Sequence, residues 1–116
     1  MADVLVADDE EGFRSLLRSI LTEEGHVVRE AEDGNSLLAL YNERNPDLII
    51  LDLIMPEKEG IETIIQIRRH NNSVKIIAMS AAPYNLKVAK MMGADYILEK
   101  PFAQESITNL VKAALG

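Results

Sequence analysis

The feature that most constrains the fold is an alternation of short apolar runs with longer amphipathic stretches. Five short runs occur along the 116 residues, at 4–7, 27–28, 48–51, 76–79 and 96–98. The first, third and fourth runs are continuously apolar, which indicates strands covered on both faces, as in a parallel sheet. The second and fifth runs are the least apolar, so we expect these two strands at the edges of the sheet.

Apolar residues between the runs recur at helical spacing, which predicts one helix after each strand. The expected buried stripes are Phe13, Leu16, Leu17, Ile20 and Leu21; Leu37, Leu40 and Tyr41; Ile61, Ile64 and Ile65; Leu86, Ala89 and Met92; and Ile107, Leu110, Val111, Ala114 and Leu115. Pro83 suits the first turn of the fourth helix. Gly25 and Gly93 are expected to end the first and fourth helices.

A strand followed by a helix, five times over, predicts an α/β fold. Crossovers of this length force parallel strands with right-handed connections. A closed eight-stranded barrel needs a chain about twice as long. We therefore expect a doubly wound, open five-stranded parallel sheet with helices on both faces, forming a single domain over residues 1–116.

Composition and charge exclude several classes of function. With 12 basic and 19 acidic side chains the net charge is −7, which disfavours nucleic acid and anionic membranes as partners. The chain has no cysteine, which excludes disulfides and thiol chemistry, and His26 and His70 are too far apart in sequence to suggest a zinc site. No apolar run approaches the length that spans a membrane, so we expect a soluble, cytoplasmic protein.

Polar side chains follow four of the five predicted strands directly. Asp8 and Asp9 follow the first strand, Asp52 the third, Ser80 the fourth and Lys100 the fifth. In an open α/β sheet, ligands bind outside the carboxyl ends of the strands. Each residue alone has an ordinary explanation, such as a helix cap, a turn or a surface loop. Their shared position at one edge favours a functional site.

The acidic residues at this edge need a compensating positive charge. Two unit charges about 4 Å apart repel by roughly 4 kcal/mol at an effective dielectric of about 20. Carboxylate oxygens suit a hard cation, so we expect Mg²⁺, with Mn²⁺ or Ca²⁺ as substitutes. A cation, the Lys100 ammonium and the Ser80 hydroxyl form a phosphoryl-binding set, which leaves Asp52 as the nucleophile.

The motifs that carry these residues resemble those of response-regulator receiver domains of the CheY-like kind, over the whole chain. The matching segments are VADDE at 6–10, DLIMP at 52–56 with Gly60 after it, MSA at 79–81, GAD at 93–95 and KPF at 100–102. The resemblance implies a flavodoxin-like sheet with strand order 2-1-3-4-5.

The resemblance also implies a role for each residue of the acidic site. Asp52 is the expected phosphoacceptor, and it also contributes to the metal site. Asp9 is the principal carboxylate ligand of Mg²⁺, and Asp8 holds a metal-bound water or ligates more weakly. The backbone carbonyl of Ile54 is the further protein ligand.

Lys100 and Ser80 are expected to act on the phosphoryl group. By the resemblance, Lys100 pairs first with the carboxylate and then with the phosphoryl group, and the Ser80 hydroxyl follows the phosphoryl oxygen. The Lys100–Pro101 peptide is expected to be cis. Ile97 stands where the family usually has an aromatic residue, so we expect the switch to be carried mainly by the loop at 81–83 and the helix that follows.

The resemblance names the partners by class. The phosphodonor is a phosphohistidine on a sensor histidine kinase or phosphotransfer protein. A downstream effector binds the face made by the fourth helix, the fifth strand and the fifth helix. The chain is then a signalling phosphoacceptor rather than an enzyme that turns over a substrate.

Three other functions fit the residues less well. An aspartate-nucleophile phosphatase needs a general acid two residues after the nucleophile, where this chain has Ile54. A binding module that no longer signals does not need the complete acidic set. A nucleotide-binding domain needs a glycine-rich phosphate loop, and no such motif follows any predicted strand.

Overall fold

A computed structural model describes residues 1–55 and 59–116, so Pro56 of the DLIMP motif lies outside the described residues. Strands and helices alternate along the chain. The strands are β1 (Asp3–Ala7), β2 (Val27–Ala31), β3 (Leu48–Asp52), β4 (Lys75–Ser80) and β5 (Tyr96–Glu99). The helices are α1 (Glu11–Glu23), α2 (Gly34–Glu43), α3 (Gly60–Arg68), α4 (Pro83–Met92) and α5 (Gln104–Leu115).

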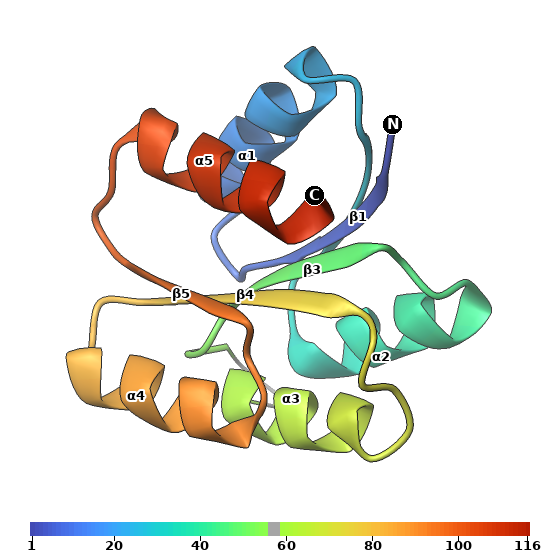
Figure 1. Ribbon diagram of the computed structural model, residues 1–116, viewed down its shortest axis with the longest axis vertical. Coiled ribbons are helices and arrows are strands. Elements are labelled where there is room, and N and C mark those ends of the chain that lie inside the picture. The colour runs from blue at the N-terminus through green and yellow to red at the C-terminus, as the bar shows by residue number, and fades with distance from the viewer. Residues whose placement is uncertain (56–58) are drawn as a thin grey trace.

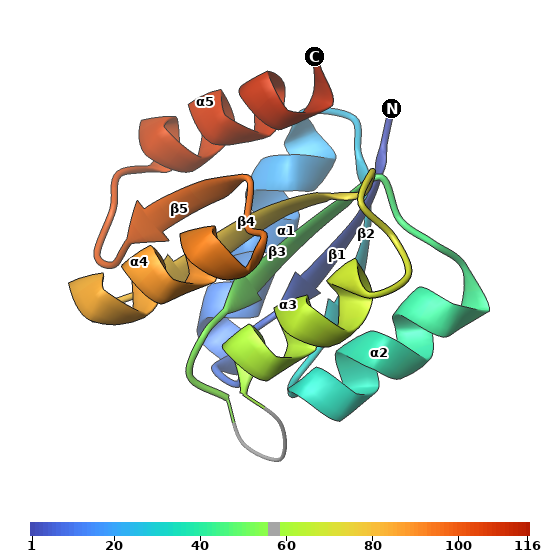
Figure 2. The same ribbon diagram turned by 60° about the horizontal axis from the view of Figure 1, so that its bottom comes forward.

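The five strands form one parallel sheet in the order β2-β1-β3-β4-β5. This confirms the predicted strand order and places β2 and β5 at the edges. Helices α1 and α5 cover one face of the sheet, and α2, α3 and α4 cover the other (Figures 1 and 2). Of the helices in the described parts of the chain, none has the length and apolar character needed to cross a membrane.

The sheet separates two apolar clusters, because β1, β3 and β4 present buried side chains to both faces. One cluster, on the side of α1 and α5, includes Leu17, Leu21, Ile50, Ile77, Ile107 and Val111. The other, on the side of α2, α3 and α4, includes Leu37, Ile49, Ile64, Ile67, Ile76 and Leu86. The predicted doubly wound α/β architecture is therefore confirmed.

Two residues of the predicted helical stripes are exposed instead. Leu16 is 53% exposed and Met92 is 38% exposed. At about 100° per residue, each lies roughly a quarter turn from the centre of its helix's buried face. A residue at that angle satisfies the spacing rule and still faces solvent.

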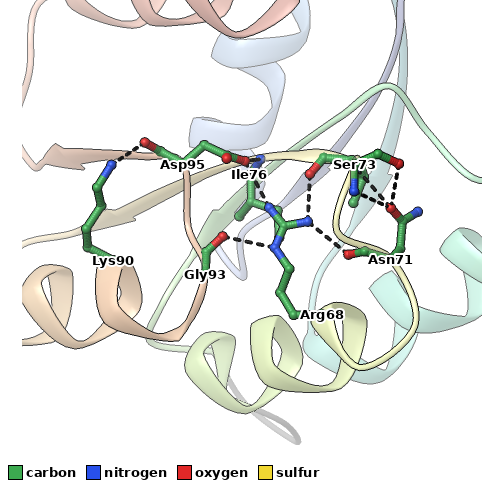
Figure 3. A network of polar contacts seen from close by, with 8 residues as sticks. Arg68, Asn71, Ser73, Ile76, Lys90, Gly93 and Asp95 are labelled. Atoms are coloured by element: carbon green, nitrogen blue, oxygen red, sulfur yellow. Dashed lines mark hydrogen bonds and ion pairs between the residues drawn. The ribbon is translucent and has the colours of Figure 1, made fainter.

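At the amino ends of β4 and β5, Arg68 joins three segments of the chain (Figure 3). Its Nε donates to the Gly93 carbonyl at 3.0 Å, its Nη1 to the Val74 carbonyl at 2.8 Å and its Nη2 to Asp95 Oδ2 at 2.9 Å. The same Asp95 oxygen accepts from the Ile76 amide at 2.8 Å. This cluster, the Arg68 clamp, ties the ends of α3 and α4 to the starts of β4 and β5.

Candidate functional site

The acidic side chains converge at the carboxyl edge of the sheet, as predicted. Ala7, the last residue of β1, pairs with Leu51 of β3, so Asp8 and Asp52 come one step further along two neighbouring strands. Carboxylate oxygens of Asp8, Asp9 and Asp52 all lie within 4.8 Å of one another. Asp8 is fully buried and Asp52 is 8% exposed, whereas Asp9 is exposed.

Lys100 brings the compensating charge from the far end of the sequence. Its Nζ donates to Asp8 Oδ2 at 2.8 Å and to Asp52 Oδ2 at 2.9 Å. The Lys100 amide donates to the Ser80 carbonyl at 2.9 Å, which fixes the segment after β5 against the end of β4. The Lys100–Pro101 peptide is cis, as the resemblance implies.

The electrostatics of Lys100 keep it charged. Burial alone lowers its pKa, but the hydrogen bonds and charges of Asp8 and Asp52 outweigh burial and raise the pKa above the usual lysine value. The ammonium is therefore protonated across the physiological range. It offsets part of the negative charge that the two buried carboxylates bring together.

Backbone amides fix the second oxygen of each buried carboxylate. Asp8 Oδ1 accepts from the Glu10 amide at 2.9 Å, and Asp52 Oδ1 accepts from the Ile54 amide at 3.0 Å. Each side chain thus folds back onto the loop that follows its own strand. Such local bonds to Asp side chains are favoured by the sharp change of direction at a strand end.

Gly60 lies against the backbone directly behind Asp52. Its amide donates to the Leu53 carbonyl at 3.0 Å. A Cβ at this position would lie 2.7 Å from the Asp52 carbonyl oxygen and 2.7 Å from the Leu53 Cα, closer than real Cβ contacts. The sequence motif included Gly60, but only the structure shows why it must be glycine: α3 begins in contact with the strand end that carries Asp52.

Ser80 ends β4 and is fully buried. Its Oγ accepts from the Ala82 amide at 3.0 Å, so the hydroxyl oxygen holds the start of the loop that leads to α4. Ile54 is 57% exposed beside Asp52 and offers no polar side-chain group there. The structure thus brings Asp8, Asp9, Asp52 and Lys100 together, and it places Ser80 on the next strand.

Two further residues contact the site that sequence reasoning did not single out. Arg14 Nη1 donates to the Asp8 carbonyl at 2.7 Å, and the Lys100 Nζ lies 4.2 Å from the centroid of the Phe13 ring. The helical spacing predicted only that Phe13 is one member of a buried stripe. The available signal was its position, four residues after Asp9 and therefore in the first turn of the helix that follows the acidic loop.

The donor set at this edge fits a hard divalent cation. It offers carboxylate oxygens from Asp8, Asp9 and Asp52, one of them on an exposed side chain, and Mg²⁺ typically takes one or two carboxylates and completes its octahedron with water or phosphate oxygens. Lys100 already neutralises part of the charge. A dication can therefore share these carboxylates without an all-protein cage.

Fold and site together define a class: a doubly wound five-stranded domain with an acidic pocket and one lysine at the carboxyl edge of its sheet. A family model described as the response regulator receiver domain matches residues 4–112. The chain belongs to this family, and so it is the receiver domain of a two-component response regulator.

Individual relatives agree with the family assignment. The chain is 36% identical over 114 residues to the chemotaxis protein CheY of Halobacterium salinarum, covering 97% of this chain and 95% of that protein. It is 40% identical over 114 residues to the transcriptional regulatory protein ResD of Bacillus subtilis, covering 97% of this chain but only 47% of the relative. The chain thus spans nearly all of one curated relative and about half of others.

Solved structures show the same fold. The receiver domain of NtrX from Brucella abortus superposes with a TM-score of 0.92 at 32% identity, covering 97% of this chain and 98% of that one. The chemotaxis response regulator CheY4 of Vibrio cholerae superposes with a TM-score of 0.92 at 29% identity, covering 99% of each chain.

Proposed function

We propose that Asp52 accepts a phosphoryl group from the phosphohistidine of a sensor histidine kinase or phosphotransfer protein. The observation that carries the proposal is the Lys100 ammonium, which contacts Asp8 at 2.8 Å and Asp52 at 2.9 Å beside a third carboxylate. This arrangement holds Asp52 buried and within hydrogen-bonding distance of a cation. Those are the conditions in which a carboxylate can act as a nucleophile toward phosphorus.

The transfer step exchanges one bond for another. An oxygen of Asp52 forms a bond to phosphorus while the bond between phosphorus and the donor imidazole nitrogen breaks. The electron pair stays on that nitrogen, which is then free to take a proton. Lys100 is placed to pair with the phosphoryl oxygens once the Asp52 charge is used in the new bond.

Asp8, Asp9, Asp52 and the backbone carbonyl of Ile54 are the proposed holders of Mg²⁺, which Mn²⁺ or Ca²⁺ can replace. When bound, the ion supplies positive charge to the phosphoryl oxygens. The exposed carboxylate of Asp9 supports its proposed role as the principal ligand, because it can reach the ion without giving up the bond that Asp8 makes to Lys100.

The proposed output is a change in the face made by α4, β5 and α5. Both helices contact β5. Tyr84 and Met91 on α4 are 75% and 72% exposed, and Ile97 on β5 is 40% exposed, which supports this face as a binding surface for a downstream effector.

We place the chain in the cytoplasm as one signalling domain over residues 1–116. It catalyses only its own phosphorylation and dephosphorylation, because Ile54 offers no general acid for turnover.

Phosphorylation by a small donor tests the proposal. Incubated with Mg²⁺ and acetyl phosphate, the protein is expected to gain one phosphoryl group, seen in the intact mass and removed by hydroxylamine. Asp52→Asn is expected to remain unlabelled. Asp47→Asn is the matched control, because Asp47 is an exposed carboxylate at the opposite end of β3. Labelling of Asp52→Asn at the parent's level would rule out Asp52 as the phosphoacceptor.

A further inference from the structure

The Lys100 ammonium has an aromatic partner as well as its two carboxylates. Its Nζ lies 4.2 Å from the centroid of the Phe13 ring, well within the range of about 6 Å over which a cation is attracted to the ring face. Another lysine–aromatic contact of the protein, between Lys90 and Tyr96, is longer at 5.9 Å. The lysine side chain is 21% exposed, so water screens the contact only in part.

Phe13 is itself held in place by the segment that carries Lys100. The rings of Phe13 and Phe102 meet edge to face, with centroids 5.7 Å apart and planes at 81°. Phe13 also packs against the apolar cluster under α1 and α5. Residues 100 and 102 therefore both contact a ring that belongs to the first turn of α1, more than eighty positions earlier in the sequence.

The Phe13 ring matters because the same carboxylates contact the Lys100 ammonium and are the proposed ligands of a divalent cation. Lys100 bonds to Asp8 and Asp52, and these oxygens belong to the same cluster that fits a divalent cation. Charge drawn toward a dication weakens the hold of the carboxylates on the ammonium. The ring face attracts the ammonium through its quadrupole and offers no oxygen ligand, so its hold on Lys100 does not depend on those carboxylates.

We propose that Phe13 is a positioning residue. Through a cation–π contact it keeps the Lys100 ammonium beside Asp52 while the carboxylates bind a divalent cation. The proposal rests on the proposed phosphoacceptor function and adds a residue of α1 to it. The proposed role of Phe13 includes no contact with the phosphoryl group or the metal. Phe13 acts through Lys100 alone.

A fluorination series at position 13 tests the contact. Phenylalanine is replaced by its 4-fluoro, 3,5-difluoro and 3,4,5-trifluoro analogues, which withdraw electron density from the ring face with little change of shape. Two readouts are followed: the initial rate of Asp52 phosphorylation by acetyl phosphate in saturating Mg²⁺, and the ring-current shift of the Lys100 side-chain protons by NMR, with and without Mg²⁺.

Both readouts are expected to change stepwise with fluorination. By the trifluoro analogue the rate falls about threefold to tenfold, and the upfield shift of the Lys100 protons shrinks, most in Mg²⁺. Phe13→Tyr keeps the ring and stays within about twofold of the parent rate, whereas Phe13→Leu matches the trifluoro protein. The same series at Phe102 is the control and changes both readouts less than the series at position 13, because Phe102 contacts the Phe13 ring and the ammonium lies over Phe13.

Rates and Lys100 shifts that stay flat across the position 13 series would overturn the proposal and leave Phe13 a packing residue. Equal responses at positions 13 and 102 would overturn it as well. If the parent protein gains no phosphoryl group, the proposed function fails. In that case the Lys100 shifts still decide whether Phe13 holds the ammonium.

Discussion

At the scale of single residues, the site depends on one lysine that forms ion pairs with two buried carboxylates. Removing the cation leaves Asp8 fully buried and Asp52 nearly so, without their charged partner. Breaking a buried ion pair from one side typically costs about 3–5 kcal/mol. Lys100 is therefore a stabilising residue as well as a candidate partner of the phosphoryl group.

Lys100→Met is expected to lower the free energy of unfolding by about 3 kcal/mol in EDTA. Mg²⁺ is expected to restore part of this loss, because a ligand at about 100 times its Kd stabilises the folded state by about 2.7 kcal/mol. Urea denaturation with and without Mg²⁺ measures both values. Lys112→Met, at an exposed position of α5, is the control. Its free energies of unfolding in EDTA and in Mg²⁺ are expected to stay close to those of the parent protein. An equal loss for both variants would contradict the role given to Lys100.

Asp9 differs from the other two carboxylates because its side chain is exposed. Asp9→Asn is expected to weaken Mg²⁺ binding at least about tenfold, since a hard cation prefers charged oxygen ligands. The metal-free variant should be no less stable than the parent, because one source of repulsion is gone. Calorimetric titration gives the affinity, with Glu32→Gln as a control of equal charge change after β2. Unchanged affinity in Asp9→Asn would remove Asp9 from the proposed Mg²⁺ ligands.

At the scale of elements, the Arg68 clamp holds the carboxyl end of α4 (Figure 3). Its donors reach the Gly93 carbonyl and Asp95, and Gly93 has a φ of 126°, which favours glycine. A Cβ on Gly93 would also lie 2.7 Å from the Arg68 Cγ. The end of α4 is thus fixed to α3 and β5, at the end of the sheet opposite the acidic site.

Arg68→Ala is expected to destabilise the fold by about 2–4 kcal/mol, because several acceptors and the Asp95 carboxylate lose their donor together. Urea denaturation measures the loss, and hydrogen exchange should show faster opening at Gly93 and Ala94 than in the parent. Arg69→Ala, at the neighbouring exposed position, is the matched control and should stay within about 0.5 kcal/mol. A similar loss of stability for both variants would mean that the hydrogen bonds of the Arg68 clamp stabilise the fold no more than an exposed arginine does.

At the scale of the whole molecule, the clamp and the site act on opposite ends of α4. Ser80 Oγ accepts from the Ala82 amide just before the helix begins, while Arg68 holds the residue after it. Ile97 is β-branched, 40% exposed and unable to reorient as a ring does. A switch in this protein is therefore expected to move the start of α4 more than its end.

Amide chemical shifts with and without beryllofluoride, a phosphoryl mimic, check this expectation. Large changes are expected from Ser80 through Leu86, with smaller ones toward Met92 and small ones at Tyr96 and Ile97. Arg68→Ala should extend the large changes to the end of α4. Changes centred on Tyr96 and Ile97, with α4 silent, would show that the switch does not run through the loop after Ser80.

The element-scale predictions succeeded where burial is complete and failed at the margins of helices. The continuous apolar runs of β1, β3 and β4 indicated strands covered on both faces, and the structure shows them so. Leu16 and Met92 fitted the spacing of a buried stripe but are exposed. Periodicity gives the angle of a residue around its helix. The width of the buried face depends on what packs against it, which the helix's own sequence does not contain.

The sequence by itself determined the order of elements, the parallel sheet and the residues at its carboxyl edge, because these follow from local periodicity and from the handedness of crossovers. Only the tertiary structure decided which of those residues meet. Lys100 and Asp8 are 92 positions apart, yet their charges lie 2.8 Å from each other. The ring of Phe13 beside that lysine, the contact of Gly60 with the Asp52 backbone and the Arg68 clamp are of the same kind. Each depends on distances between segments that chain connectivity leaves open and packing fixes.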